Sequence, residues 1–122
     1  YLKRLSALGP KMVAITSVMT GENEMSVAVY DKETDKYFKI DCGYINRPFH
    51  GTGDIFAAVL CGEYVKSRDF LASAALAVGF VKEAITETLK HKELKTENGV
   101  CFEKVLAKYF ANKISYSLYT EI

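Results

Sequence analysis

Apolar residues recur along the chain at both helical and strand spacing, which predicts a mixed α/β unit. An apolar stripe of helical spacing opens the chain and ends at a helix stop, Gly9 and Pro10. The apolar run at residues 12–15 is typical of a strand buried on both faces of a parallel sheet. Strict alternation over residues 25–30 and 37–42, on either side of a charged turn, predicts a β-hairpin.

Two longer helices and one short helix are predicted in the second half of the chain. Residues 52–66 carry an inward apolar face, and residues 69–90 form a long apolar stripe that Asp69 is well suited to cap. Apolar positions over residues 102–110 fit one face of a final helix. The tail at 112–122 is ambiguous, because its alternating apolar positions are also compatible with a strand.

These elements predict a three-layer α/β arrangement with one sheet. We expect the strand at residues 12–15 to be central in a mostly parallel sheet and the hairpin at 25–42 to extend that sheet. Thr16 and Ser17 then lie at or just beyond the carboxyl end of the central strand.

Composition and charge exclude several classes of function. Of the 122 residues, 49% are hydrophobic, and sixteen basic residues against fifteen acidic ones give a formal charge of +1. Such a balance does not suit a nucleic-acid binder, and the densest basic stretches are interleaved with glutamates, as in solvated helix faces. Three scattered cysteines and two histidines form neither a disulfide framework nor a metal site. We expect a reduced, cytoplasmic protein without a membrane segment.

The first residue, Tyr1, is not a methionine, and a helical stripe follows it at once. We therefore expect the chain to be a piece of a larger protein or a processed product.

The stretch Gly51, Thr52, Gly53, Asp54, called here the anion turn (residues 51–54), carries the chemistry of the chain. Its two glycines lie at the start of a predicted helix, where unpaired N–H groups and the positive end of the helix dipole attract anions. Asp54 in the first turn could act as a base beside a bound anion. The turn could equally be an ordinary loop-to-helix junction, with Asp54 compensating the dipole, and we take His50 as a loop residue.

Four stretches in order resemble the ribokinase-like superfamily, most closely its pyridoxal (pyridoxamine) kinases. They read LSALGP at residues 5–10, VAITS at 13–17, GTGDIFAA at 51–58 and GVCFE at 99–103. The resemblance implies that residues 1–122 are the carboxy-terminal, ATP-binding part of a ribokinase-like three-layer αβα fold. Family chains are considerably longer, and their amino-terminal part supplies most of the vitamin pocket.

The resemblance also implies the reaction, the ATP-dependent phosphorylation of the 5'-hydroxymethyl group of pyridoxal, pyridoxine or pyridoxamine in vitamin B6 salvage. Asp54 matches the catalytic base that takes the hydroxyl proton. The N–H groups of Gly51, Thr52 and Gly53 would form the anion hole for the transferring phosphoryl group. This fits phosphoryl transfer, in which positioning and fixed positive dipoles supply most of the catalysis.

The ATP site is implied by the same resemblance. Thr16 and Ser17 match a hydroxyl pair that touches the ATP phosphates, and Ile45, Phe49 and Val81 fall where the family lines its adenine pocket. Plain core packing explains the last three equally well. We expect the hydroxyl pair and the anion turn to converge on one hole, since strand ends and helix starts meet at one rim of an open sheet. Mg²⁺ would bridge the phosphates, and a monovalent cation such as K⁺ often assists.

Other functions stay open. A hydroxymethylpyrimidine kinase shares the fold and the reaction, although that branch typically has cysteine where Asp54 stands. A sugar or nucleoside kinase of the superfamily also keeps the anion turn. A non-catalytic nucleotide-binding fragment is the alternative from another class. For the full-length protein we expect a homodimer.

Overall fold

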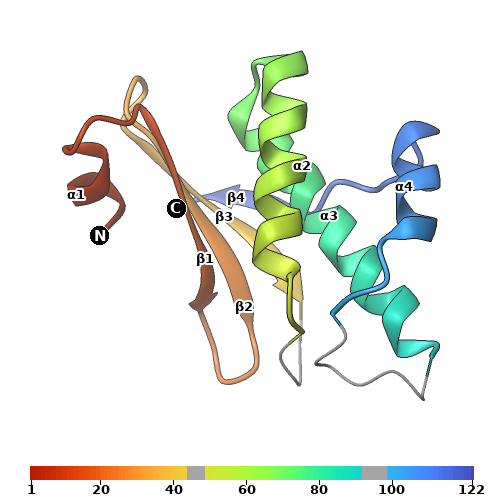
Figure 1. Cartoon of the computed structure of the whole chain (residues 1–122). Helices are drawn as coiled ribbons and strands as arrows, with labels where there is room; N and C mark the ends of the chain where they lie inside the picture. Colours follow the sequence, from red (N-terminus) through yellow and green to blue (C-terminus); the bar gives the residue numbers. More distant parts are fainter. Residues whose placement is uncertain (44–48, 92–98) are drawn as a thin grey trace. The chain divides into compact units, whose positions relative to one another are not determined.

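The computed structural model describes residues 1–43, 49–91 and 99–122, which form two compact units. The sheet unit contains Tyr1–Ile45 and Ser117–Ile122, and the helical unit contains Asn46–Tyr116. Figure 1 labels their elements, and each unit is described by itself. In the described ranges no helix is both long and apolar enough to cross a lipid bilayer.

The sheet unit is a meander of antiparallel strands preceded by one short helix, as Figure 1 shows. Its strands follow one another in space in the order of the sequence, and every neighbouring pair is antiparallel. The elements are α1 (Leu2–Ser6), β1 (Met12–Met19), β2 (Met25–Asp31), β3 (Lys36–Gly43) and β4 (Tyr119–Glu121). The tail at 112–122, whose alternation was compatible with a strand, therefore does contain a short strand, β4.

The predicted hairpin is confirmed as β2 and β3. Its last paired residues are Asp31 and Lys36. The Asp31 carboxylate holds the turn, because it accepts hydrogen bonds from the Glu33 N–H and the Thr34 hydroxyl, both at 2.9 Å. Alternation could predict this element because successive side chains of a strand point to opposite faces of the sheet.

The strand at residues 12–15 was expected to be central in a mostly parallel sheet. The described strands do not form such a sheet. Among the described strands β1 lies at the end of the order, and it pairs antiparallel with β2. The reason is the short turn after β1, which the Thr20 N–H closes with a hydrogen bond of 3.0 Å to the Glu24 carbonyl. Parallel pairing needs a crossover of a dozen or more residues. Only Val13 of the run at residues 12–15 is fully buried.

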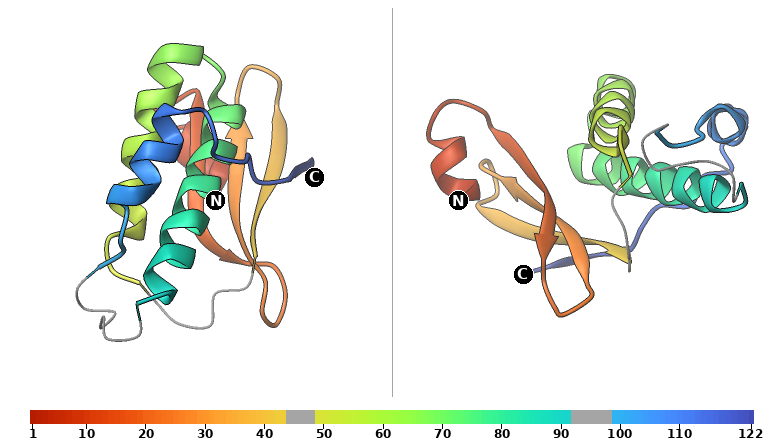
Figure 2. Two further views of the ribbon diagram at one scale, coloured as in Figure 1. Left: turned by 90° about the vertical axis from the view of Figure 1, so that its right-hand side faces the viewer. Right: turned by 60° about the horizontal axis from the view of Figure 1, so that its bottom comes forward.

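The helical unit confirms the three predicted helices to within two residues at each end. They are α2 (Thr52–Ser67), α3 (Phe70–Leu89) and α4 (Glu103–Phe110). Asp69 caps α3 as expected, since its carboxylate accepts a hydrogen bond of 3.0 Å from the Ala72 N–H. Figure 2 shows α3 beside both α2 and α4.

The core of the helical unit is α3, which is buried without interruption from Ser73 to Phe80. Small side chains make this possible, because three alanines of that stretch are fully covered. At Gly79 the chain approaches so closely that an added Cβ would overlap the Ser115 carbonyl oxygen. A helical stretch covered on every side explains the alanines within it.

Acidic residues of α2 and α3 hold α4 in place. Lys104 and Lys108 of α4 form ion pairs with Glu87 and Glu83 of α3, at 3.0 and 2.8 Å. Tyr109 donates a hydrogen bond to Glu63 of α2. Lys104 and Lys108 are both exposed, which fits the solvated helix face that their interleaved sequence predicted.

Candidate functional site

The anion turn begins α2 with a glycine in a conformation that other residues rarely adopt. Gly51 is the N-cap residue and has φ 84°, in the left-handed region. The helical ladder starts with the Ile55 N–H, which donates to the Gly51 carbonyl at 3.0 Å. The N–H groups of Thr52, Gly53 and Asp54 precede that ladder, so they are available to an acceptor from outside the helix.

The turn is open to solvent. Gly51, Gly53 and Asp54 are exposed, and a Cβ added at either glycine would meet no atom of the described residues within 4 Å. These residues therefore leave room for the close approach of a ligand. Their backbone groups lie at the start of a helix, and their role as an anion hole stays a prediction.

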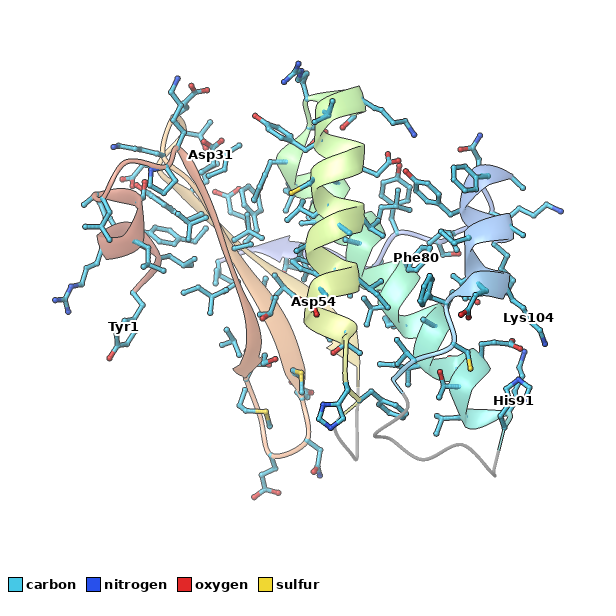
Figure 3. The ribbon with its side chains drawn as sticks, in the orientation of Figure 1. Tyr1, Asp31, Asp54, Phe80, His91 and Lys104 are labelled. Atoms are coloured by element: carbon cyan, nitrogen blue, oxygen red, sulfur yellow. The ribbon has the colours of Figure 1, made fainter. Side chains whose placement is uncertain are left out.

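Asp54 lies on the first turn of α2 (Figure 3). Its carboxylate makes no hydrogen bond or ion pair with any residue that the structure describes. Both predicted roles fit this position. A carboxylate here is stabilised by the helix dipole, and it is also free to accept a proton from a ligand.

The three candidates for an adenine pocket have different outcomes. Phe49 precedes the anion turn, is 8% exposed, and its carbonyl accepts a hydrogen bond of 3.2 Å from the Thr52 hydroxyl. Val81 is half-buried on α3. Ile45 lies outside the described residues. Core packing accounts for the burial of Phe49 and Val81, so their role in binding stays a prediction.

We expected Thr16 and Ser17 at or just beyond the carboxyl end of the strand. The structure instead places both residues inside β1, which continues to Met19. The pairing of β1 with β2 shifts between Ile15 and Val18, which makes Thr16 and Ser17 the two residues of a β-bulge. Ser17 has φ 59°, and both side chains are exposed. A bulge with a left-handed serine is the kind of local strain that is frequent at binding sites.

The hydroxyl pair belongs to the sheet unit and the anion turn to the helical unit. Their convergence on one hole stays a prediction.

Sequence reasoning assigned no role to two further residues of the helical unit, Gly99 and Thr88. A Cβ added at Gly99 would lie 3.6 Å from the His50 carbonyl oxygen, beside the anion turn. Thr88 is buried at 3% exposure and accepts a hydrogen bond of 2.8 Å from the Cys101 N–H. Gly99 could have been suspected from its place in the stretch at 99–103. Nothing in the sequence distinguishes Thr88.

Among the described residues no three acidic, histidine or cysteine side chains are placed to hold a metal ion together. A magnesium ion at a nucleotide site needs no such cluster, since it is held mainly by phosphate oxygens and water with one or two carboxylates. The open anion turn and its exposed carboxylate fit an ion that arrives with its nucleotide.

A glycine-led helix start with an exposed carboxylate in its first turn, carried by a mixed α/β chain, is typical of a phosphate-binding protein. Comparison with known families makes the class definite. A sequence model described as phosphomethylpyrimidine kinase matches residues 1–99. The chain therefore belongs to the phosphomethylpyrimidine kinase family.

Solved structures agree with this assignment. A Bacteroides thetaiotaomicron protein, provisionally described as a phosphomethylpyrimidine kinase, is 31% identical over 100% of the chain, with a TM-score of 0.88. A second crystal form of it, with pyridoxal, gives a TM-score of 0.87 at 31% identity. Pyridoxal kinase from Leishmania donovani, in complex with ADP and pyridoxine, is 18% identical over 98% of the chain, with a TM-score of 0.82, and shares the fold.

The chain spans about two fifths of the length of these proteins, between 41% and 43%. No curated protein sequence matches it.

Proposed function

We propose that this chain is the carboxy-terminal, nucleotide-binding and catalytic part of a kinase that phosphorylates the 5'-hydroxymethyl group of pyridoxal, pyridoxine or pyridoxamine. The observation that carries the proposal is the open anion turn, with Gly51 left-handed and Asp54 exposed and without a partner among the described residues. Membership of the phosphomethylpyrimidine kinase family and the Bacteroides relative solved with pyridoxal support it.

In the proposed reaction Asp54 takes the proton from the substrate's hydroxymethyl group. The resulting oxygen nucleophile bonds to the γ-phosphorus of ATP, the bond between that phosphorus and the bridging oxygen breaks, and ADP leaves. Negative charge spreads over the equatorial oxygens in the transition state. The N–H groups of Gly51, Thr52 and Gly53 stabilise that charge, because they are fixed dipoles that need no reorganisation.

The nucleotide part of the proposal rests on the resemblance and on local geometry. Thr16 and Ser17 offer exposed hydroxyls at a β-bulge for the ATP phosphates. Phe49, Val81 and Ile45 are the proposed lining of the adenine pocket. Mg²⁺ bound to the phosphates would neutralise part of their charge, and a monovalent cation such as K⁺ is proposed to assist.

A hydroxymethylpyrimidine kinase is the second candidate, and the description of the matching family favours it. Asp54 argues for the B6 vitamers, since the pyrimidine branch typically has cysteine at this position. The two substrates share a hydroxymethyl group on an aromatic nitrogen ring, so the anion turn serves either one. The ring-binding residues would decide between them.

The test is a substrate panel with the full-length protein. Purified protein is incubated with Mg-ATP and, separately, pyridoxal, pyridoxine, pyridoxamine, hydroxymethylpyrimidine, a sugar and a nucleoside, and each product is identified by mass. We expect the B6 vitamers to have the highest kcat/KM. A preference for hydroxymethylpyrimidine would replace the proposal with the second candidate. Phosphorylation of the sugar or nucleoside alone would move the protein to another branch, and no turnover would favour a non-catalytic module.

Two expectations for the whole protein remain proposals: a homodimer and a cytoplasmic location. Light scattering on the purified protein tests the first.

A further inference from the structure

A short segment after α3, residues 99–101, is fastened to that helix through one buried side chain. The Cys101 N–H donates to the Thr88 hydroxyl oxygen at 2.8 Å, and the Thr88 hydroxyl donates to the Ala84 carbonyl at 2.7 Å. Thr88 is 3% exposed, and Val100 beside the contact is 8% exposed. The hydroxyl thus joins the segment to the backbone of α3 out of reach of most competing water.

The same segment lies next to the backbone that begins the anion turn. Gly99 has φ 79°, and a Cβ added there would lie 3.6 Å from the His50 carbonyl oxygen. That carbonyl belongs to the peptide group whose N–H is on Gly51. The described chain has no cis peptide bond, so the His50 carbonyl and the Gly51 N–H point in opposite directions. Gly99 therefore lies behind the peptide group whose N–H is proposed to face the phosphoryl group.

We infer that Thr88 is a positioning residue for the anion turn, acting through Cys101 and Gly99 on the peptide group between His50 and Gly51. The inference rests on the proposed function, because it assigns the purpose of this brace to phosphoryl transfer. Hydrogen bonds join Thr88 to Ala84 and Cys101, so we assign it an indirect role. It fixes the segment that limits rotation of the His50–Gly51 peptide group.

Such a brace matters because a preorganised dipole stabilises a transition state only while it points at the developing charge. Gly51 is poorly suited to hold its own orientation, since glycine has the widest choice of backbone conformations. The anion turn is also exposed and has no side-chain cap. A neighbouring segment that is itself fixed to α3 supplies the constraint that these residues lack.

The same helix offers a matched control. Thr86 is exposed on α3, and its hydroxyl donates to the Lys82 carbonyl at 2.9 Å, the same bond to the residue four positions earlier that Thr88 makes. In the part of the chain that the structure describes, Thr86 has no bond to another segment. A threonine-to-valine change removes the helical bond at both positions, and only at 88 does it remove the link to Cys101.

The experiment compares Thr88→Val, Thr88→Ser and Thr86→Val in the full-length protein. Steady-state kinetics with Mg-ATP and pyridoxal are recorded together with thermal unfolding and the NMR resonance of the Gly51 amide. We expect Thr88→Val to lower kcat about 10- to 100-fold, the scale of a misplacement of about 1 Å, while KM for ATP changes less. It should also shift the Gly51 resonance. Thr88→Ser should recover most of both, and Thr86→Val should change neither.

If Thr88→Val does not fold, Gly99→Ala tests the contact from its other end. Alanine is strained at φ 79°, so the substitution displaces the segment although its methyl group would lie at an ordinary van der Waals distance of 3.6 Å from the His50 carbonyl oxygen. The same loss of kcat and the same shift at Gly51 are expected.

A Thr88→Val protein that melts earlier but keeps its kcat and its Gly51 resonance would overturn the inference, as would an equal loss in Thr86→Val. Should the wild-type protein phosphorylate nothing in the substrate panel, the proposed function would fall, and the Gly51 resonance alone would decide the inference. An unchanged resonance in Thr88→Val or Gly99→Ala would then refute the brace.

Discussion

Replacing Asp54 by asparagine in the full-length protein separates the proposed catalytic role from a purely structural one. Asparagine keeps the size and polarity of the side chain but cannot accept the substrate proton. If Asp54 is the general base, turnover of pyridoxal should fall roughly 10²- to 10⁴-fold, with the affinity for ATP little changed. Steady-state production of ADP gives kcat and KM, and calorimetric titration gives the dissociation constant of the nucleotide.

The structure limits how much of that loss could come from unfolding. Asp54 is exposed and forms no hydrogen bond or ion pair with the described residues. Asparagine therefore removes only the interaction of its charge with the helix dipole, which is worth about 0.3–1 kcal/mol. For a protein of two to three hundred residues this corresponds to a decrease in melting temperature of at most about 4 °C.

Asp69→Asn is the matched control, because Asp69 is also exposed at a helix start and asparagine caps a helix about as well as aspartate does. We expect it to keep both activity and stability. The catalytic assignment is refuted if Asp54→Asn turns over at close to the wild-type rate, even if it melts slightly earlier. A loss of activity in both variants would also count against a specific role for Asp54.

Two further predictions concern stability. Gly79→Ala should destabilise the protein by about 1–3 kcal/mol in chemical unfolding, because its Cβ overlaps the Ser115 carbonyl oxygen. Gly62→Ala in α2, where an added Cβ meets no described atom within 4 Å, should stabilise the protein by about 0.5–1 kcal/mol. If both substitutions change the free energy of unfolding equally, the close approach of Gly79 to Ser115 is contradicted. Hydrogen bonds from Lys90 and Lys104 lower the pKa of Glu87 from 4.5 to about 2. Its stabilising contribution is therefore complete above about pH 4.5 and lost towards pH 2, so wild type and Glu87→Gln should differ in stability at pH 7 and converge near pH 2.

Local patterns predicted the elements of this fold well, because each depends on residues close together in the sequence. Alternation identified the hairpin, and helical spacing with Asp69 as N-cap identified α3. The position of the anion turn at a helix start could be predicted for the same reason, since glycine spacing at a helix start is a local signal.

Features that depend on distant residues were wrong or missed. A buried apolar run at residues 12–15 looks the same in a parallel and an antiparallel sheet, and the turn after β1 decides between them. The β-bulge at Thr16 and Ser17 appears only in the pairing with β2. The hydrogen bond between Cys101 and Thr88 spans 13 positions, and Gly99 lies near His50 across 49 positions; no sequence periodicity predicts either feature.

The left-handed conformation of Ser17 restricts which sequences this bulge can carry over evolution. Glycine, asparagine and aspartate reach that region most easily, whereas a β-branched residue is a genuine outlier there. The order of Thr16 and Ser17 therefore cannot be reversed without cost, even though both orders supply two hydroxyls. Threonine at 17 would face a backbone penalty of roughly 1–2 kcal/mol. In related kinases that have another residue at this position, we expect small or amide side chains there. Valine, isoleucine and threonine should be rare at this position, whichever substrate the kinase phosphorylates.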